Sequence, residues 1–189
     1  MIGIINRAFA AFVTEQLGEA VWAEASARAG IRGERFLTSE AYPDEVTFQL
    51  AAHVCDIASV SLDDALSLFG EFWIKYAHRE GYDPLIDEAG GDLENVLRGL
   101  EALHTRVGLI FPGSDVPNFQ AQGDRSSGMH LLYTSRRTGL GPFVQGTLLG
   151  LVKHFGEDVT IVREPLASEG SGTVERFTFT WTSASSAPE

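Results

Sequence analysis

Along the first 111 residues, apolar side chains recur three or four positions apart, the spacing of helices that bury one face. The runs start at residues typical of helix N-termini, such as Pro43, Ser61 and Asp92, and glycines follow several of them. This pattern predicts helices over residues 5–17, 20–29, 43–58, 61–80 and 93–109. The apolar stripe of the last helix consists of Leu93, Val96, Leu97, Leu100, Leu103 and Val107.

After Phe111 the pattern changes. Turn-forming residues fill positions 112–117, and from Met129 onward apolar residues alternate with polar ones. Alternation with a period of two is typical of half-buried strands. We therefore predict antiparallel strands over residues 129–135, 159–164 and 174–182, and a helix over residues 144–155.

The order of these elements predicts an α+β fold in a single domain over residues 1–182. A helical N-terminal lobe covers about residues 1–60. The C-terminal lobe, of about residues 61–182, combines helices with a small antiparallel sheet. Residues 183–189 are small and polar, so we expect a frayed tail.

Composition narrows the classes of function. The 189 residues include 26 acidic and 14 basic side chains, and the net charge of −12 argues against nucleic acid as a partner. Cys55 is the only cysteine, so an internal disulfide and a thiolate-rich structural zinc site are both excluded. The chain shows no signal-peptide pattern and no apolar run long enough to span a membrane, so we expect a soluble, cytoplasmic protein.

His104 lies on the apolar stripe of the helix over residues 93–109, beside Leu100 and Leu103. A single histidine in this position is more often a hydrogen-bonded core residue than a ligand. A buried neutral imidazole is, however, also what axial coordination of haem iron requires. His104 alone leaves both interpretations open.

A second set of polar side chains ends the first predicted strand. Tyr133, Ser135 and Arg137 occupy alternate positions and therefore share one side of the extended chain. Three donors on one side suit paired carboxylates, and the guanidinium group can bind one carboxylate through two parallel hydrogen bonds. A solvated strand end with ordinary polar residues is the alternative.

The combination of a helical bundle that opens at Met1, the helical His104, Pro117 thirteen residues later and the Tyr133-x-Ser135-x-Arg137 motif resembles the haem nitric oxide/oxygen binding (H-NOX) family. The resemblance covers nearly the whole chain and is to the standalone bacterial type. It implies haem b held between the two lobes.

The resemblance also implies roles for individual residues. His104 would be the proximal ligand of the iron, and Tyr133, Ser135 and Arg137 would hold the propionates. Pro117 would press on the porphyrin, because its locked φ makes the ring stiff, and Ile5 would lie against the haem.

The distal side of such a site would lack a hydrogen-bond donor. Family members that bind dioxygen stably carry a tyrosine after the Tyr-x-Ser-x-Arg motif, whereas this chain has Pro142 or Phe143 in that position. Phe9 and Trp73 also match distal positions. Trp73 carries an indole N–H, although an aromatic residue at helical spacing is more often core packing. The resemblance therefore implies binding of nitric oxide and CO without a stable O2 complex.

Signalling would follow from rupture of the bond between His104 and the iron, with relaxation of the haem and the lobes. We expect no enzyme activity, because the motifs of serine hydrolases, zinc proteases and phosphate-binding loops are absent. The output would pass to a separate histidine kinase or cyclic-di-GMP enzyme. Two alternatives are a non-haem α+β module that binds an apolar small molecule or lipid, and a purely structural adaptor.

Overall fold

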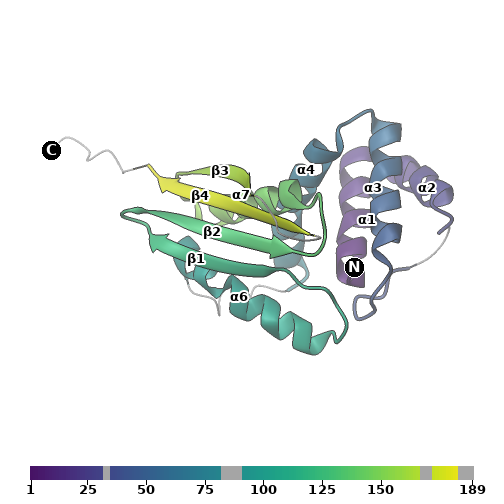
Figure 1. Cartoon of the computed structure of the whole chain (residues 1–189). Helices are drawn as coiled ribbons and strands as arrows, with labels where there is room; N and C mark the ends of the chain where they lie inside the picture. The colour runs from purple at the N-terminus through teal and green to yellow at the C-terminus, as the bar shows by residue number, and fades with distance from the viewer. Residues whose placement is uncertain (32–34, 82–90, 167–171, 183–189) are drawn as a thin grey trace.

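The computed structural model describes residues 1–31, 35–81, 91–166 and 172–182, so the predicted tail over residues 183–189 lies outside the described residues (Figure 1). The helices are α1 (Gly3–Leu17), α2 (Glu19–Arg28), α3 (Asp44–Ala58), α4 (Leu62–Arg79), α6 (Leu93–Ile110) and α7 (Gly141–Phe155). The strands are β1 (Asn118–Asp124), β2 (Gly128–Ser135), β3 (Val159–Leu166) and β4 (Thr173–Trp181). The α+β fold class predicted from the sequence is confirmed.

The four strands form one antiparallel sheet in the order β1-β2-β4-β3. One face is buried against α6 and α7 because the inward positions of the central strands are large and apolar. These inward residues are Met129, Leu131, Tyr133, Phe177 and Phe179.

Strand β1 corrects the sequence prediction, which left residues 118–124 out of the sheet. Of its seven residues, only Phe119 is buried, and the others are mostly polar or glycine. Alternation is therefore too weak to see in the sequence, and the strand forms because its backbone pairs with β2 from Asn118 to Asp124. The start of α7 also differs: it begins at Gly141 rather than at residue 144, with Pro142 in its first turn, where the missing N–H costs no helical bond.

Two hydrophobic clusters organise the molecule. One lies among α1, α2, α3 and part of α4, and the other lies between the sheet and the helices α6 and α7 (Figure 1). Helix α4 contributes to both, with Phe69 and Tyr76 in the first cluster and Ile74 in the second. Trp73 packs against both clusters, so α4 connects the two halves of the fold.

Helices α4 and α7 approach each other closely at glycines. A Cβ atom built on Gly70 would lie 2.2 Å from the carbonyl oxygen of Phe143, and one on Gly146 would lie 1.9 Å from that of Ser67. Any larger side chain would therefore push the helices apart. Among the described helices, none is both long and apolar enough to cross a membrane.

Candidate functional site

His104 lies in the C-terminal half of α6, half-buried, with its ring 4.8 Å from that of Phe119 on β1. Its Nδ1 atom is 2.8 Å from the carbonyl oxygen of Leu100, so Nδ1 carries the proton and donates it. Burial lowers the pKa of His104, although the bond to Leu100 acts in the opposite direction. The neutral ring therefore keeps a lone pair on Nε2, the form that binds a metal ion.

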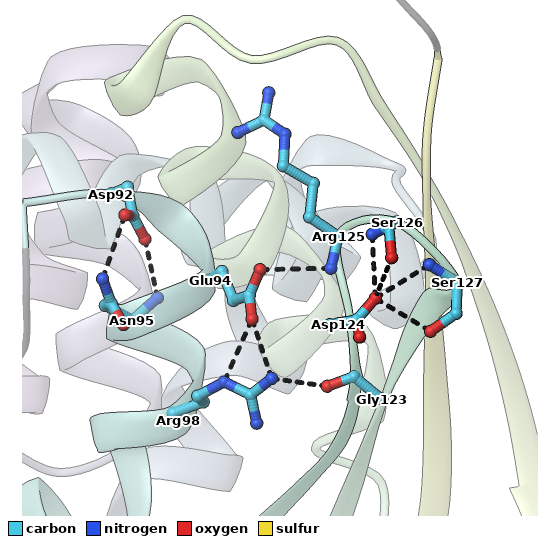
Figure 2. Close-up of polar contacts among 9 residues, drawn as sticks. All are labelled: Asp92, Glu94, Asn95, Arg98, Gly123, Asp124, Arg125, Ser126 and Ser127. Atoms are coloured by element: carbon cyan, nitrogen blue, oxygen red, sulfur yellow. Dashed lines mark hydrogen bonds and ion pairs between the residues drawn. The ribbon is translucent and has the colours of Figure 1, made fainter.

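The N-terminal half of α6 is anchored to the turn between β1 and β2 (Figure 2). Glu94 accepts a hydrogen bond from Arg98 Nη2 at 2.7 Å and another from the backbone N–H of Arg125 at 3.1 Å. Arg98 Nη2 also donates to the carbonyl oxygen of Gly123 at 2.5 Å. The half of the helix that precedes His104 is thus held in place by polar contacts as well as by its buried apolar stripe.

The side chain of Asp124 stabilises the turn between β1 and β2, which contacts α6 (Figure 2). One carboxylate oxygen accepts from the backbone N–H of Ser126 at 2.9 Å and from that of Ser127 at 2.8 Å. These bonds and those from the two serine hydroxyls lower the pKa of Asp124 to about 2. The turn therefore keeps its charged, ordered form over the physiological pH range.

Tyr133 and Ser135 share one side of β2, as the alternation predicted, and that side is buried. Arg137 lies two residues beyond the end of the strand, so the predicted common side does not extend to it. Tyr133 is 1% exposed, and its ring lies 5.4 Å from that of Phe119. Burial raises the pKa of the phenol, and a hydrogen bond with Ser135 offsets part of that shift. Phe119 thus contacts both the His104 ring and the Tyr133 ring.

Arg137 crosses from the sheet to the helical half of the fold. Its Nε donates to Asp44 Oδ2 at 2.6 Å, and its Nη2 lies 3.1 Å from Asp44 Oδ1. Its Nη1 donates to the carbonyl oxygen of Asp115, and its backbone N–H donates to Ser135 Oγ at 3.1 Å. The guanidinium group, with its side chain 12% exposed, therefore already binds a carboxylate in the two-bond geometry expected for a propionate.

Asp44 forms a second ion pair, because the amino group of Met1 lies 2.5 Å from Asp44 Oδ1. Burial alone would raise the pKa of Asp44, but the hydrogen bonds from Arg137 and from the Met1 amino group outweigh burial. The pKa of Asp44 therefore lies below its ordinary value of 3.8.

This pairing predicts a pH-dependent contribution to stability. Because the pKa of Asp44 is lower in the folded state, its contribution is complete above pH 3.8 and is lost as the pH falls through the lowered value. We expect Asp44→Asn to lower the free energy of unfolding by about 1 kcal/mol at pH 7. Urea unfolding at pH 7 and pH 3 measures this, and a difference that does not shrink at pH 3 would contradict it.

The connection between α6 and β1 lies next to Arg137. Pro117 is half-buried and directly precedes β1. Ser114, beside the residue whose carbonyl oxygen binds Arg137, has a buried hydroxyl without a hydrogen-bond partner among the described residues. A buried hydroxyl without a partner is costly, so a further polar group bound here would lower the energy.

The predicted distal residues form one aromatic group at the hydrophobic cluster of the helical half, on which Phe143 packs from α7. Phe69 connects the members of this group, because its ring lies 5.1 Å from that of Phe9 and 5.1 Å from that of Phe143. Ile5 packs on the same cluster, and Trp73 stacks on Tyr76 at 6.1 Å. The side chains of Ile5, Phe9 and Phe143 offer no hydrogen-bond donor.

The structure thus brings the predicted residues together as two groups. His104, Tyr133, Ser135 and Arg137 belong to the sheet half, whereas Ile5 and Phe9 belong to the helical half, and Arg137 bridges the halves through Asp44. Sequence analysis missed Asp44 and Ser114. Asp44 looked like an ordinary first-turn carboxylate of a helix, and nothing in the sequence connects it to a residue 93 positions later.

The donor set fits haem better than a metal ion held by protein ligands alone. In the part of the chain that the structure describes, no three His, Cys, Asp or Glu side chains are grouped to hold a metal ion. A haem iron needs a single histidine from the protein, and the carboxylates of its propionates need donors such as Arg137.

Comparison with known proteins identifies relatives over most of the chain. A family model described as Haem-NO-binding (HNOB) matches residues 2–163. Soluble guanylate cyclase 89Db of Drosophila melanogaster is 24% identical over 161 residues, 85% of this chain and 24% of that protein. Soluble guanylate cyclase gcy-37 of Caenorhabditis elegans is 26% identical over 185 residues, 95% of this chain and 26% of that protein. The chain spans about a quarter of the length of these relatives.

Solved structures share the fold. The crystal structure of an oxygen binding H-NOX domain related to soluble guanylate cyclases matches with a TM-score of 0.86 and 17% identity, over 100% of this chain and 99% of that chain. A mutant of T. Tengcongensis H-NOX matches with a TM-score of 0.87 and 17% identity, over 98% of this chain and 100% of that chain.

Proposed function

Because this chain belongs to the haem-NO-binding family, whose members bind haem and sense gases, we propose that it is a haem-based nitric oxide sensor. The observation that carries the proposal is His104, whose ring is held by Leu100 in the tautomer that offers Nε2 as a ligand. The domain of this family is a sensor and is not itself catalytic, and the matches to guanylate cyclases cover this domain alone.

The cofactor that we propose is haem b, bound without covalent links. The single cysteine, Cys55, is not part of the Cys-x-x-Cys-His pattern that attaches haem covalently. Bound haem would supply a ferrous iron that takes a diatomic gas. His104 would bind the iron, and Tyr133, Ser135 and Arg137 would bind the propionates.

The remaining proposed contacts are apolar. Pro117 and Ile5 would lie against the porphyrin, and the aromatic group containing Phe9 and Phe143 would form the distal side together with Trp73. Phe9 and Phe143 give no hydrogen bond to the partial negative charge of bound dioxygen, and we propose that Trp73, whose ring stacks on Tyr76, serves as packing and not as a donor. The proposal is therefore for nitric oxide and CO as ligands, with no stable oxygen complex.

Release of His104 would convert gas binding into movement of α6. The half of α6 before His104 is anchored through Glu94 and Arg98, whereas Leu109 and Ile110 at its C-terminal end are 76% and 67% exposed. A change at His104 would therefore be passed to the C-terminal end of the helix, where these two apolar side chains face solvent. We propose that a separate signalling protein, a histidine kinase or a cyclic-di-GMP enzyme, receives this movement.

The visible spectrum of the purified protein tests the proposal. After anaerobic reduction, we expect a Soret band typical of histidine-ligated ferrous haem. Nitric oxide should shift the band to that of iron that has lost its histidine, and air should give no stable oxygen spectrum. A protein that fails to bind haem after reconstitution would instead favour the non-haem module for an apolar ligand, and a long-lived oxygen complex would contradict the proposed distal side.

The proposed role of Arg137 gives a matched pair of variants. We expect Arg137→Ala to weaken haem binding by roughly 1.5–3 kcal/mol, because one charged partner of a propionate is lost. Arg136→Ala is the control, since the side chain of Arg136 is 87% exposed and its Nε lies 3.8 Å from Asp115 Oδ1, a long ion pair. Haem transfer to apomyoglobin measures both dissociation rates, and equal rates for the two variants would contradict the assignment.

A further inference from the structure

Glu175 is a buried carboxylate on the inward face of β4, the face that also carries Phe177 and Phe179. The residue is 3% exposed, and among the described residues it is the only acidic one that is buried. A buried carboxylate is costly unless it is paired, so the residues around it must compensate its charge. None of the roles proposed for the haem site involves Glu175.

Arg163 on β3 compensates this charge. Its Nε donates to Glu175 Oε2, and its own side chain is 23% exposed. The two residues are diagonal neighbours on paired strands, because Arg163 lies opposite Phe177. Removal of either partner would leave the other charge uncompensated, and the carboxylate, which is the more deeply buried of the two, would be the more costly one to leave alone.

The carboxylate of Glu175 also lies against the first residue of α7. A Cβ atom built on Gly141 would lie 2.2 Å from Glu175 Oε1 and 2.3 Å from Oε2, so a side chain at residue 141 would displace the carboxylate. In the described structure no side chain caps the N-terminus of α7, and its first turn contains no acidic residue. Because a helix N-terminus carries a partial positive charge, Glu175 supplies from β4 the negative charge that α7 itself lacks.

Glu175 is also the direct neighbour of Tyr133, its partner in the register between β2 and β4. Both side chains are on the buried face. Burial is the main cause of the raised pKa of Tyr133, and the negative charge of Glu175 raises that pKa further. Tyr133 is proposed to bind a propionate, and Phe143, two residues after Gly141, is proposed for the distal side. Glu175 therefore lies against the two elements that carry these residues.

We propose that Glu175 is a positioning residue of the haem site, and that its ion pair with Arg163 sets the charge beside Tyr133. This rests on the proposed function, because it assigns both residues a role relative to haem. The carboxylate holds the first turn of α7 against β4. Its negative charge favours ferric iron, which carries one more positive charge than ferrous iron, and the guanidinium group of Arg163 opposes that effect. Arg163 therefore favours the ferrous state that the proposed gas binding requires.

A potentiometric titration of the haem-loaded chain, followed by absorbance, tests this role. We expect Glu175→Gln to raise the midpoint potential of the iron, because a negative charge is lost. Arg163→Gln should lower the potential, because the carboxylate is left uncompensated. Both variants should lower the unfolding temperature of the haem-free chain. A merely structural role would lower stability in the same way but would not shift the potential in opposite directions.

The double variant E175Q/R163Q keeps the test decisive if one single variant fails to fold. It leaves no unpaired charge in the buried site, so it should fold, and its midpoint potential should lie close to that of the unmodified chain. A potential that differs from that of the unmodified chain by as much as a single variant's does would contradict the proposed balance of charges.

Glu164 and Arg176 give matched controls on the same two strands. They lie opposite each other on β3 and β4, and their side chains are 58% and 41% exposed and 3.5 Å apart. Each is one position from a member of the buried pair and therefore faces the other side of the sheet. Glu164→Gln and Arg176→Gln make the same chemical changes and should leave the midpoint potential unchanged.

Two results separate this proposal from the proposed function. If the unmodified chain binds haem but Glu175→Gln and Arg163→Gln shift the potential in the same direction, or no more than the controls do, the role of the pair is overturned and the sensor proposal stands. If the unmodified chain binds no haem after reconstitution, the proposed function is overturned and the role of the pair with it.

Discussion

We expect the His104→Ala variant to lose haem, with an affinity lower by about two orders of magnitude or more. The variant keeps the apolar stripe of α6 but removes the imidazole that Leu100 orients, so the proposed axial ligand is missing. Exogenous imidazole should restore the Soret band, because it can occupy the space that the side chain leaves. The ratio of Soret absorbance to absorbance at 280 nm measures retention before and after imidazole is added.

His130→Ala serves as the control for this experiment. His130 is an exposed histidine on β2, and its Nδ1 lies 3.0 Å from Thr178 Oγ1. Because it faces away from the buried side of the sheet, its loss should leave haem retention unchanged. If His104→Ala retains haem without imidazole as well as His130→Ala does, His104 is not the axial ligand.

We expect Gly146→Ala to lower the free energy of unfolding by about 3 kcal/mol. The added methyl group would lie 1.9 Å from the carbonyl oxygen of Ser67, which belongs to the backbone of α4 and cannot rotate away. The helices would have to separate, and the contacts of Trp73 with both hydrophobic clusters would loosen. For a protein of this size the loss corresponds to a decrease in Tm of about 6–12 °C, which calorimetry can measure.

Gly108→Ala is the matched control for the glycine prediction. A Cβ atom there would lie 3.3 Å from a methyl carbon of Val116, a side-chain atom that can shift. Alanine also favours the helical conformation over glycine by up to about 1 kcal/mol, so this variant should be close to neutral or slightly stabilised. Equal destabilisation by the two substitutions would show that close approach of α4 and α7 is not the cause.

Much of the fold was predictable from local periodicity. The predicted helices over residues 43–58 and 93–109 correspond to α3 and α6, and the three predicted strands correspond to β2, β3 and β4. Strand β1 was missed because its side chains carry almost no apolar alternation and its order comes from backbone pairing with β2. Strands of this kind are specified by a neighbour and not by their own sequence.

For the polar residues of the candidate site, too, some features were predictable from the sequence and others were not. Tyr133 and Ser135 share one face of β2 because strand residues two apart always do, so the sequence alone predicted their common side. Asp44 became a partner of Arg137 only through tertiary packing, because 93 residues separate them and no period connects them. The pairing of Lys153 with Glu71 across α4 and α7 was unpredictable for the same reason.

By itself, the sequence determined which faces of the helices and strands are buried, where His104 lies on its helix, and that Tyr133 and Ser135 share one side of a strand. Backbone periodicity alone decides these features. Only the tertiary structure decided which faces meet: the aromatic group around Phe69 and the bridge from Arg137 to Asp44. Such contacts depend on how closely helices approach, and here glycines at residues 70, 146 and 150 set that distance for α4 and α7.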